Sequence, residues 1–203
     1  MNKLTVLSGV ALFASLVAVT PAIANPCTQA SEAPGIFVPE RGCVSVGVGY
    51  LYQHFNVLGT TFHNNTYNVN VTTHLVDWLT GAAGRLTVGA EVALNGGFGG
   101  HPFGNPSLVA KNLFVGGGPH LAVQSPSRFE PWVHGLVGWQ HFRFTQGDVL
   151  GSNSTLGFIV GGGVDIRLRP LLSWRIEGDY VGTTFQSSVQ SNYSAGTGLV
   201  LYF

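Results

Sequence analysis

From Cys43 onward, the chain alternates between apolar residues and small or polar residues with a period of two. The first such stretch places Val44, Val46, Val48 and Tyr50 on one face, with serine and glycine residues between them. Because successive side chains of a strand point to opposite faces, this pattern predicts a strand of about ten residues with one apolar face. An apolar outer face and a small or polar inner face are typical of a strand in a transmembrane β-barrel.

The same pattern recurs along the rest of the chain. We expect seven further strands near residues 66–76, 86–94, 111–123, 131–144, 156–168, 173–184 and 193–203. The connections predicted to be long lie near residues 53–64, 95–107, 145–154 and 185–192, and the short ones near 77–83, 124–129 and 169–172. Long and short connections alternate, as extracellular loops and periplasmic turns do. The predicted fold is therefore all-β, an eight-stranded antiparallel transmembrane β-barrel, whose interior is just wide enough for side chains.

Composition strengthens the membrane interpretation. Of the 203 residues, 45% are hydrophobic and only 9% are charged, whereas about a quarter of a typical soluble domain is charged. No apolar run after Ala24 is long enough for a membrane helix, and only helices and closed barrels satisfy every backbone group in lipid. A soluble β-sandwich is the alternative fold, and the scarcity of charge counts against it. The near-neutral balance also argues against a nucleic-acid partner.

The N-terminus has the pattern of a removable export signal. Lys3 supplies a positive charge, Leu4–Val19 are mostly apolar, and Ala22-Ile23-Ala24 matches a signal-peptidase site. The apolar run is shorter than a spanning helix of about 20 residues, so an uncleaved anchor helix is the less favoured alternative. We expect a signal peptide at 1–24, a periplasmic lead-in at 25–42 and an outer-membrane barrel at 43–203.

The two cysteines, Cys27 and Cys43, lie close together near the mature N-terminus. In an exported protein they are expected to form a disulfide, which stabilises by about 3 kcal/mol in the chain-entropy model. The seven histidines are scattered, without the paired spacing of a zinc site. The sequence therefore predicts no metal and no cofactor.

The end of the chain resembles a known family. The last strand carries Tyr193, Leu199, Leu201 and the terminal Phe203 on one face, and it resembles the assembly signal of bacterial outer-membrane proteins. Gly161–Arg167 and Arg175–Tyr180 resemble the end of small barrels in the OmpA-like transmembrane superfamily. The resemblance covers the barrel only, without the peptidoglycan-binding domain of full-length OmpA. It implies contact with outer-membrane lipid and with the barrel-assembly machinery.

Six charged residues fall opposite the apolar strand faces, so we expect them to point into the lumen. They are Glu91, Asp165, Arg167, Arg175, Glu177 and Asp179. On the lipid face an arginine would cost about 2–4 kcal/mol at the membrane midplane, whereas inside the barrel opposite charges can pair. We expect Arg167 and Arg175 to pair with Glu91, Glu177 or Asp179. Such a network is either a structural plug or a gate that opens a narrow pore.

Two further patterns concern the barrel wall. Aromatic residues near strand ends are expected to form the girdles at the membrane surfaces: Tyr50, Tyr52, Trp78, Trp132, Trp139, Trp174, Tyr180, Tyr193 and Tyr202. The glycine triplets at 116–118 and 161–163 lie inside predicted strands and lack the Lys-Ser/Thr of a phosphate-binding loop. They are expected to allow close packing in a narrow barrel.

The predicted function is a structural or surface-binding (adhesion) role for an integral outer-membrane barrel. Its expected binding segments are the polar loops His54–Asn65, Asn95–Ser107 and Gln146–Ser154, which could hold a surface ligand. The first alternative is a small gated channel for ions or small solutes. A lipid-modifying enzyme is a third hypothesis, but His134 has no serine or carboxylate beside it in the sequence, so we expect no enzymatic activity.

Overall fold

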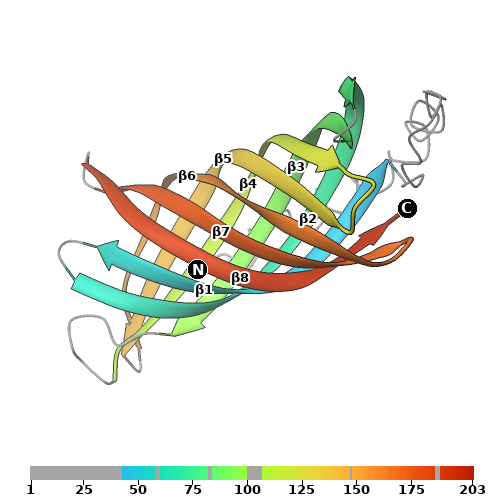
Figure 1. The fold of residues 1–203 in the computed structure, drawn as a ribbon. Helices are drawn as coiled ribbons and strands as arrows, with labels where there is room; N and C mark the ends of the chain where they lie inside the picture. Colours follow the sequence, from blue (N-terminus) through green and yellow to red (C-terminus); the bar gives the residue numbers. More distant parts are fainter. Residues whose placement is uncertain (1–42, 58–59, 82–83, 100–106, 147, 186–187) are drawn as a thin grey trace.

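In the computed structural model, the described residues are 43–203 except 58–59, 82–83, 100–106, 147 and 186–187. Eight strands fill almost all of this range. They are β1 (Val44–Val57), β2 (Thr60–Gly81), β3 (Gly84–Gly99), β4 (Val109–Gln124), β5 (Phe129–Gln146), β6 (Asp148–Arg169), β7 (Leu172–Phe185) and β8 (Ser188–Tyr202). They form one closed barrel (Figure 1).

Each strand pairs antiparallel with its neighbours in sequence, and β1 pairs with β8 to close the barrel. At this seam Ser45 lies opposite Tyr202 and His54 lies opposite Tyr193. Backbone hydrogen bonds between Val44 and Phe203 extend the seam by one further pair. The predicted eight-stranded antiparallel barrel is confirmed.

The two ends of the barrel differ in what they carry. At one end, called the C-terminal end, β2, β4, β6 and β8 finish; at the other, called the hairpin end, β1, β3, β5 and β7 finish. In Figure 1 the C-terminal end lies to the right. These two names are kept below.

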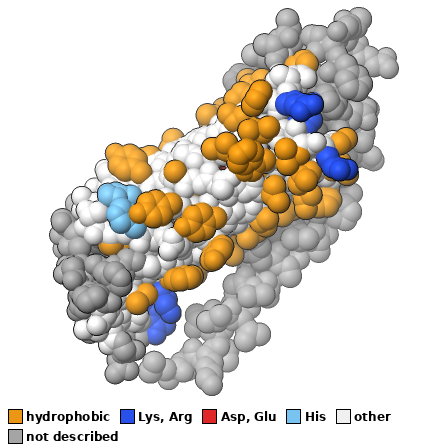
Figure 2. All heavy atoms as spheres, turned by 60° about the horizontal axis from the view of Figure 1, so that its bottom comes forward, with side chains coloured by type: hydrophobic (Ala, Val, Ile, Leu, Met, Phe, Trp, Pro, Cys, Tyr) orange, Lys and Arg blue, Asp and Glu red, His pale blue; other side chains and the backbone are white. Residues whose placement is uncertain are grey.

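Side chains alternate between the lumen and the outer wall as the sequence pattern predicts. On β8, Tyr193, Leu199 and Leu201 are exposed, whereas Ser194 and Val200 are buried. Figure 2 shows the result on one face, where hydrophobic side chains cover the middle of the wall and basic or histidine side chains lie beyond. Phe203 is also exposed. All four residues of the predicted assembly signal thus lie on the outer face, and their recognition stays a prediction.

The expected long loops are wrong in extent. His54–Asn65 belongs to β1 and β2 apart from residues 58–59, and Gln146–Ser154 belongs to β5 and β6 apart from residue 147. Asn95–Ser107 begins inside β3. Near the hairpin end both faces of a strand carry polar residues, such as His63 and Asn64 on β2, so the sequence alternation disappears although the backbone pairing continues. Among the described residues, the hairpin end therefore consists largely of paired strands.

Two members of the expected girdles are also wrong. Trp132 and Tyr202 are only 3% and 5% exposed, because both occupy inward positions of their strands. Tyr50, Tyr52, Trp139, Trp174 and Tyr193 are exposed on the wall, and the side chain of Trp78 lies outside the described part of the structure. The inward pair instead belongs to the lumen network described below.

Three sequence predictions fall outside the described residues. The signal peptide at 1–24, the lead-in at 25–42 and Cys27 all precede residue 43, so the disulfide to Cys43 stays a prediction. Within the described ranges, no helix has the length and apolar character needed to cross a membrane.

Candidate functional site in the barrel lumen

The inward side chains of β5 pass through every layer of the lumen in order. From the C-terminal end they are Glu130, Trp132, His134, Leu136, Gln140 and Phe142, and all are buried. The lumen is therefore charged near the C-terminal end and apolar in the middle. From the middle toward the hairpin end it is first rich in amides and then aromatic.

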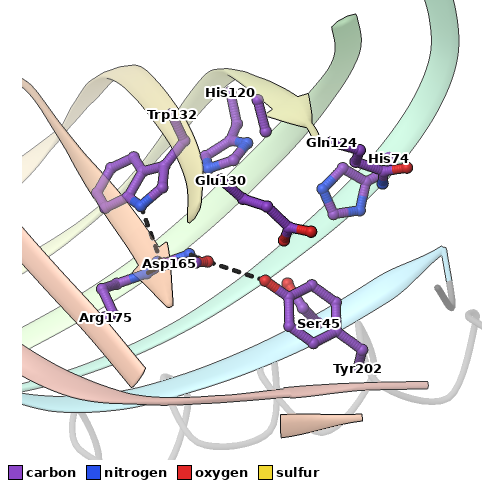
Figure 3. A pocket seen from close by; sticks show the side chains of 10 residues that line it. Ser45, His74, His120, Gln124, Glu130, Trp132, Asp165, Arg175 and Tyr202 are labelled. Atoms are coloured by element: carbon purple, nitrogen blue, oxygen red, sulfur yellow. Dashed lines mark hydrogen bonds and ion pairs between the residues drawn. The ribbon is translucent and has the colours of Figure 1, made fainter. Parts of the chain in front are cut away.

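Asp165 on β6 is the centre of the charged layer. Arg175 on β7 lies directly opposite it in the strand register and donates from Nε and Nη2 to its two carboxylate oxygens at 2.8 and 2.9 Å. The Tyr202 hydroxyl donates to Oδ2 at 2.9 Å, and the Trp132 indole donates to Oδ1 at 3.0 Å. Figure 3 shows these side chains converging on the carboxylate. The Arg175 guanidinium also lies 4.3 Å from the centre of a Trp132 ring, within range of a cation–π interaction.

A second ion pair lies nearer the C-terminal end. Arg167 donates to the Glu130 carboxylate and to the backbone carbonyl of Ser125, the latter at 2.9 Å. The expected pairing of Arg175 and Arg167 with Glu91, Glu177 or Asp179 is therefore wrong. The strand register brings both ion pairs together. Asp165 lies opposite Arg175 on β7 and opposite Glu130 on β5, and Arg167 lies two residues from Asp165 on the same face of β6.

Two carboxylates that were expected to bind arginine hold a histidine instead. His134 Nδ1 lies 3.1 Å from Glu91 Oε2, and His134 Nε2 lies 3.3 Å from Asp179 Oδ1. An imidazole can donate to both carboxylates only as the imidazolium. Ser194 donates to the other oxygen of Asp179 at 3.0 Å. The imidazole thus bridges β3 and β7 across the lumen.

All six charged residues expected in the lumen point into it. Glu91, Asp165, Arg175, Glu177 and Asp179 are buried, and the Arg167 side chain is 14% exposed. Glu177 lies between Arg175 and Asp179 on the inward face of β7. Sequence reasoning missed further members of the network: Glu130, Trp132, His134, Ser194 and Tyr202. Strand parity is the signal that could have found them, since each falls on the inward face of its strand.

Gly161 and Gly163 make room for the large side chains of the charged layer at two close approaches. A Cβ atom at Gly161 would lie 2.0 Å from Asp179 Oδ1, and one at Gly163 would lie 2.1 Å from the Ile176 carbonyl oxygen and 2.9 Å from the Trp132 ring. Real Cβ atoms essentially never approach so closely. This glycine triplet lies inside β6, where it allows the charged layer to fit.

The middle of the lumen is closed by an apolar cluster. It consists of Ala93, Phe114, Leu136, Ile159 and Val181, from five successive strands, each at most 2% exposed. No polar side chain in this cluster could carry an ion across it. The cluster therefore separates the charged layer from the rest of the lumen.

Beyond this cluster the lumen is lined by amides and hydroxyls that bind one another. Gln53 Oε1 accepts from Thr66 Oγ1 at 2.8 Å and from Asn112 Nδ2 at 2.9 Å. Asn68 donates to Asn95 at 2.8 Å. Because buried polar groups are costly when unpaired, this layer fixes the relative positions of β1 to β4.

A second apolar cluster lies nearest the hairpin end. Phe55, Phe62, Ala110 and Phe142 are buried together, and Phe144 packs against them. The Phe55 ring stacks on Phe62 and meets Phe142 edge-on, with ring centroids 5.5 and 5.3 Å apart. Apolar clusters therefore lie at two separate levels of the lumen.

A small pocket is present in the charged layer. Its lining includes Ser45, His74, Glu130, Asp165 and Tyr202 (Figure 3). Its volume is about 10 Å³, which is on the scale of a single water molecule. It is too small for a solute.

The chemistry of the lumen is that of a sealed ionic cluster. Ser194, Asp179 and His134 lie in a row, and all three are buried at the level of the charged layer. Among the described side chains, no three His, Cys, Asp or Glu residues could together hold a metal ion. The geometry supports structural ion pairing.

Comparisons with known proteins agree with this fold. No protein-family model and no curated protein sequence matches the chain. Among solved structures, Neisserial surface protein A matches with a TM-score of 0.61 at 12% identity, over 79% of this chain and 97% of that protein. The chain has the fold of the bacterial outer-membrane β-barrels. The N-terminal β-barrel domain of Pseudomonas aeruginosa OprF matches with a TM-score of 0.47 at 15% identity, over 78% of this chain and 97% of that one. At 12% identity, the likeness to Neisserial surface protein A shows the fold alone.

Proposed function

We propose that this chain is a closed, non-conducting barrel of the bacterial outer membrane, which holds a ribbon of paired strands at the cell surface for structural or binding purposes. The observation that carries the proposal is the pair of apolar clusters in the lumen. Around Phe114 and around Phe55, buried apolar side chains from several strands pack against one another at separate levels. A permanently open ion path would need a continuous polar lining.

Strand length supports the surface role. β2 and β6 have 22 residues each, whereas about 9–11 residues cross the hydrocarbon region. At about 3.3 Å per residue and a tilt of about 45°, such a strand rises about 50 Å against an apolar band of about 25 Å. Outward residues near the hairpin end are polar, among them Asn56, Thr61, His63 and Ser152. These paired strands take the place of the loops as the surface available to a ligand.

The test is single-channel recording on the refolded mature protein in planar bilayers. Folding is checked first by the difference in gel mobility between boiled and unboiled samples. We expect a folded barrel that produces no conductance steps, with a known porin refolded in the same way as the positive control. Reproducible steps from the wild-type chain would refute the closed barrel. If those steps also changed in Arg175→Ala, the charged layer would be a gate.

The membrane location has a separate test. Expressed with its own N-terminus in a Gram-negative host, the chain should fractionate with the outer membrane and resist extraction by carbonate. Recovery as a soluble periplasmic protein would contradict the location, whatever the conductance result.

A further inference from the structure

Acidic side chains lie inside this barrel in its described part, whereas basic side chains lie both inside and outside. Every acidic side chain that the structure describes is buried in the lumen: Glu91, Glu130, Asp165, Glu177 and Asp179. The exposed charged side chains in the described part are all basic: Lys111, Arg128, Arg143 and Arg169. Figure 2 shows blue and no red on the face in view. The outer wall is therefore suited to anions.

Two of these cations form a direct cross-strand pair. Lys111 on β4 lies opposite Arg143 on β5 in the register, and both side chains are exposed. Like charges directly opposite each other on a sheet are destabilising. The described carboxylates all lie in the lumen, so none of them can neutralise the two cations. An anion from outside the chain would relieve this repulsion. Lys111 and Arg143 are called the cationic pair below.

The residues beside the cationic pair add hydrogen-bonding groups. Ser152 lies opposite Arg143 on the other side, and His141 lies opposite Ser154. His141 Nδ1 is 2.8 Å from the Ser154 hydroxyl. Hydroxyl and imidazole groups of this kind can donate to phosphate oxygens. The site thus combines two cations with neutral donors across three strands.

Toward the C-terminal end from the cationic pair, the outer surface of the barrel becomes apolar. Trp139 stacks on His141 with ring centroids 5.3 Å apart, and the register places Leu156 and Val115 on either side of Trp139. Trp139 and Leu156 are 45% and 62% exposed. A ligand that fits both parts has a negative head at the cationic pair and hydrocarbon chains over Trp139. A soluble anion would use only the first part.

We propose that the cationic pair binds the phosphate group of an anionic lipid, whose acyl chains cover Trp139, Val115 and Leu156. The inference rests on the proposed function, because it places the chain in a membrane with the hairpin end at the headgroup level. A bidentate guanidinium suits a phosphate geometrically, and the neighbouring ammonium adds a second charge. This gives the wall of the barrel a specific lipid site.

The experiment measures lipid binding to the refolded barrel in neutral detergent micelles by native mass spectrometry. The probes are diphosphoryl lipid A and a dephosphorylated lipid A with the same acyl chains. Wild type should prefer the phosphorylated probe. Each cation near a membrane surface contributes about 1 kcal/mol, which is about fivefold in affinity. The variant Lys111→Gln/Arg143→Gln should therefore bind about 25-fold more weakly.

The matched control removes the same charge at the other end. Arg128→Gln/Arg169→Gln should leave the affinity unchanged. An equal loss in both variants would mean that only net charge matters and would overturn the site, as would equal binding of the two lipid probes. Displacement of the lipid by millimolar inorganic phosphate would identify a site for soluble anions and would also overturn the proposal.

The midpoint of unfolding provides a second readout, because the effect of Lys111→Gln on this midpoint should change sign when anionic lipid is added. Without anionic lipid, Lys111→Gln should raise the midpoint of unfolding, because it removes the repulsion from Arg143. With diphosphoryl lipid A, the same substitution should lower the midpoint relative to wild type. The same sign under both conditions would contradict the site. Failure of the wild-type chain to fold in phosphatidylcholine vesicles would instead count against the proposed function.

Discussion

Replacing Arg175 by methionine should be among the most damaging single changes in the barrel. The Arg175 and Asp165 side chains are 5% and 4% exposed, and the guanidinium supplies two of the four hydrogen bonds to the carboxylate. Methionine keeps much of the length and removes the charge. Breaking one partner of a buried ion pair costs about 3–5 kcal/mol, since it leaves the other charge uncompensated.

Neutralising Asp165 instead of Arg175 should reduce the free energy of unfolding by a smaller amount. In Asp165→Asn, the amide oxygen can still accept from Tyr202 or Trp132, and Arg175 still has Glu177 as a neighbour on the inward face of β7. What is lost is the charge assistance of the hydrogen bonds, about 1.5–3 kcal/mol. The double variant Arg175→Met/Asp165→Leu should cost less than the sum of the single changes, because no buried charge of this pair is left alone.

The assay is equilibrium unfolding by urea in lipid vesicles, followed by tryptophan fluorescence and by gel mobility without boiling. Refolding and unfolding curves must coincide before free energies are compared. If Arg175→Met cost less than about 1 kcal/mol, the pair would behave as a solvated surface pair and the sealed charged layer would be refuted. A larger loss for Asp165→Asn than for Arg175→Met would refute the asymmetry.

Three further changes test other parts of the barrel. Phe142→Ala should destabilise by about 3–5 kcal/mol in urea titrations yet stay silent in planar bilayers, because the cluster around Phe114 is intact. Conductance from this variant but not from wild type would show that the cluster around Phe114 does not block the lumen. Gly163→Val should fail to assemble, since its Cβ would meet the Ile176 carbonyl oxygen at 2.1 Å, and normal yields of folded barrel on gels would contradict this clash. Deletion of Phe203 should slow assembly into membranes in a pulse-chase experiment, because the residue exchanges backbone hydrogen bonds with Val44 at the seam. An unchanged rate would show that assembly depends neither on this extension of the seam nor on the proposed assembly signal.

The number and direction of the strands could be predicted because apolar and small or polar positions alternate along most of each strand. On β8, for example, the outward Leu199 and Leu201 alternate with the buried Val200 and with Gly198. Strand length could not be predicted. Beyond the lipid the outward positions His63 and Thr61 are polar, so β2 continues to pair with β1 without any period that the sequence reveals.

The members of the lumen network were only partly predictable. Parity alone places Glu91, Asp165 and Arg175 inside, but partner choice depends on register and on reach across the lumen. The Asp165–Arg175 pair could not have been derived from the turn between β6 and β7, because a register shift between Arg167 and Arg169 changes which residues face each other. The bridge from His134 to Glu91 and Asp179 joins strands that are not neighbours. No local pattern contains that information.

The position of Tyr202 has a consequence for the order in which the barrel forms. Its hydroxyl donates to Asp165 from the last strand, opposite Ser45 on the first strand, so this hydrogen bond joins residues that are distant along the chain. Contacts of large sequence separation form late, because loop-closure entropy must be overcome first. Until β8 pairs with β7, the carboxylate of Asp165 lacks the Tyr202 donor. Addition of the last strand therefore completes the hydrogen bonding at the centre of the charged layer, and a chain that ends before Tyr202 would leave this carboxylate one donor short.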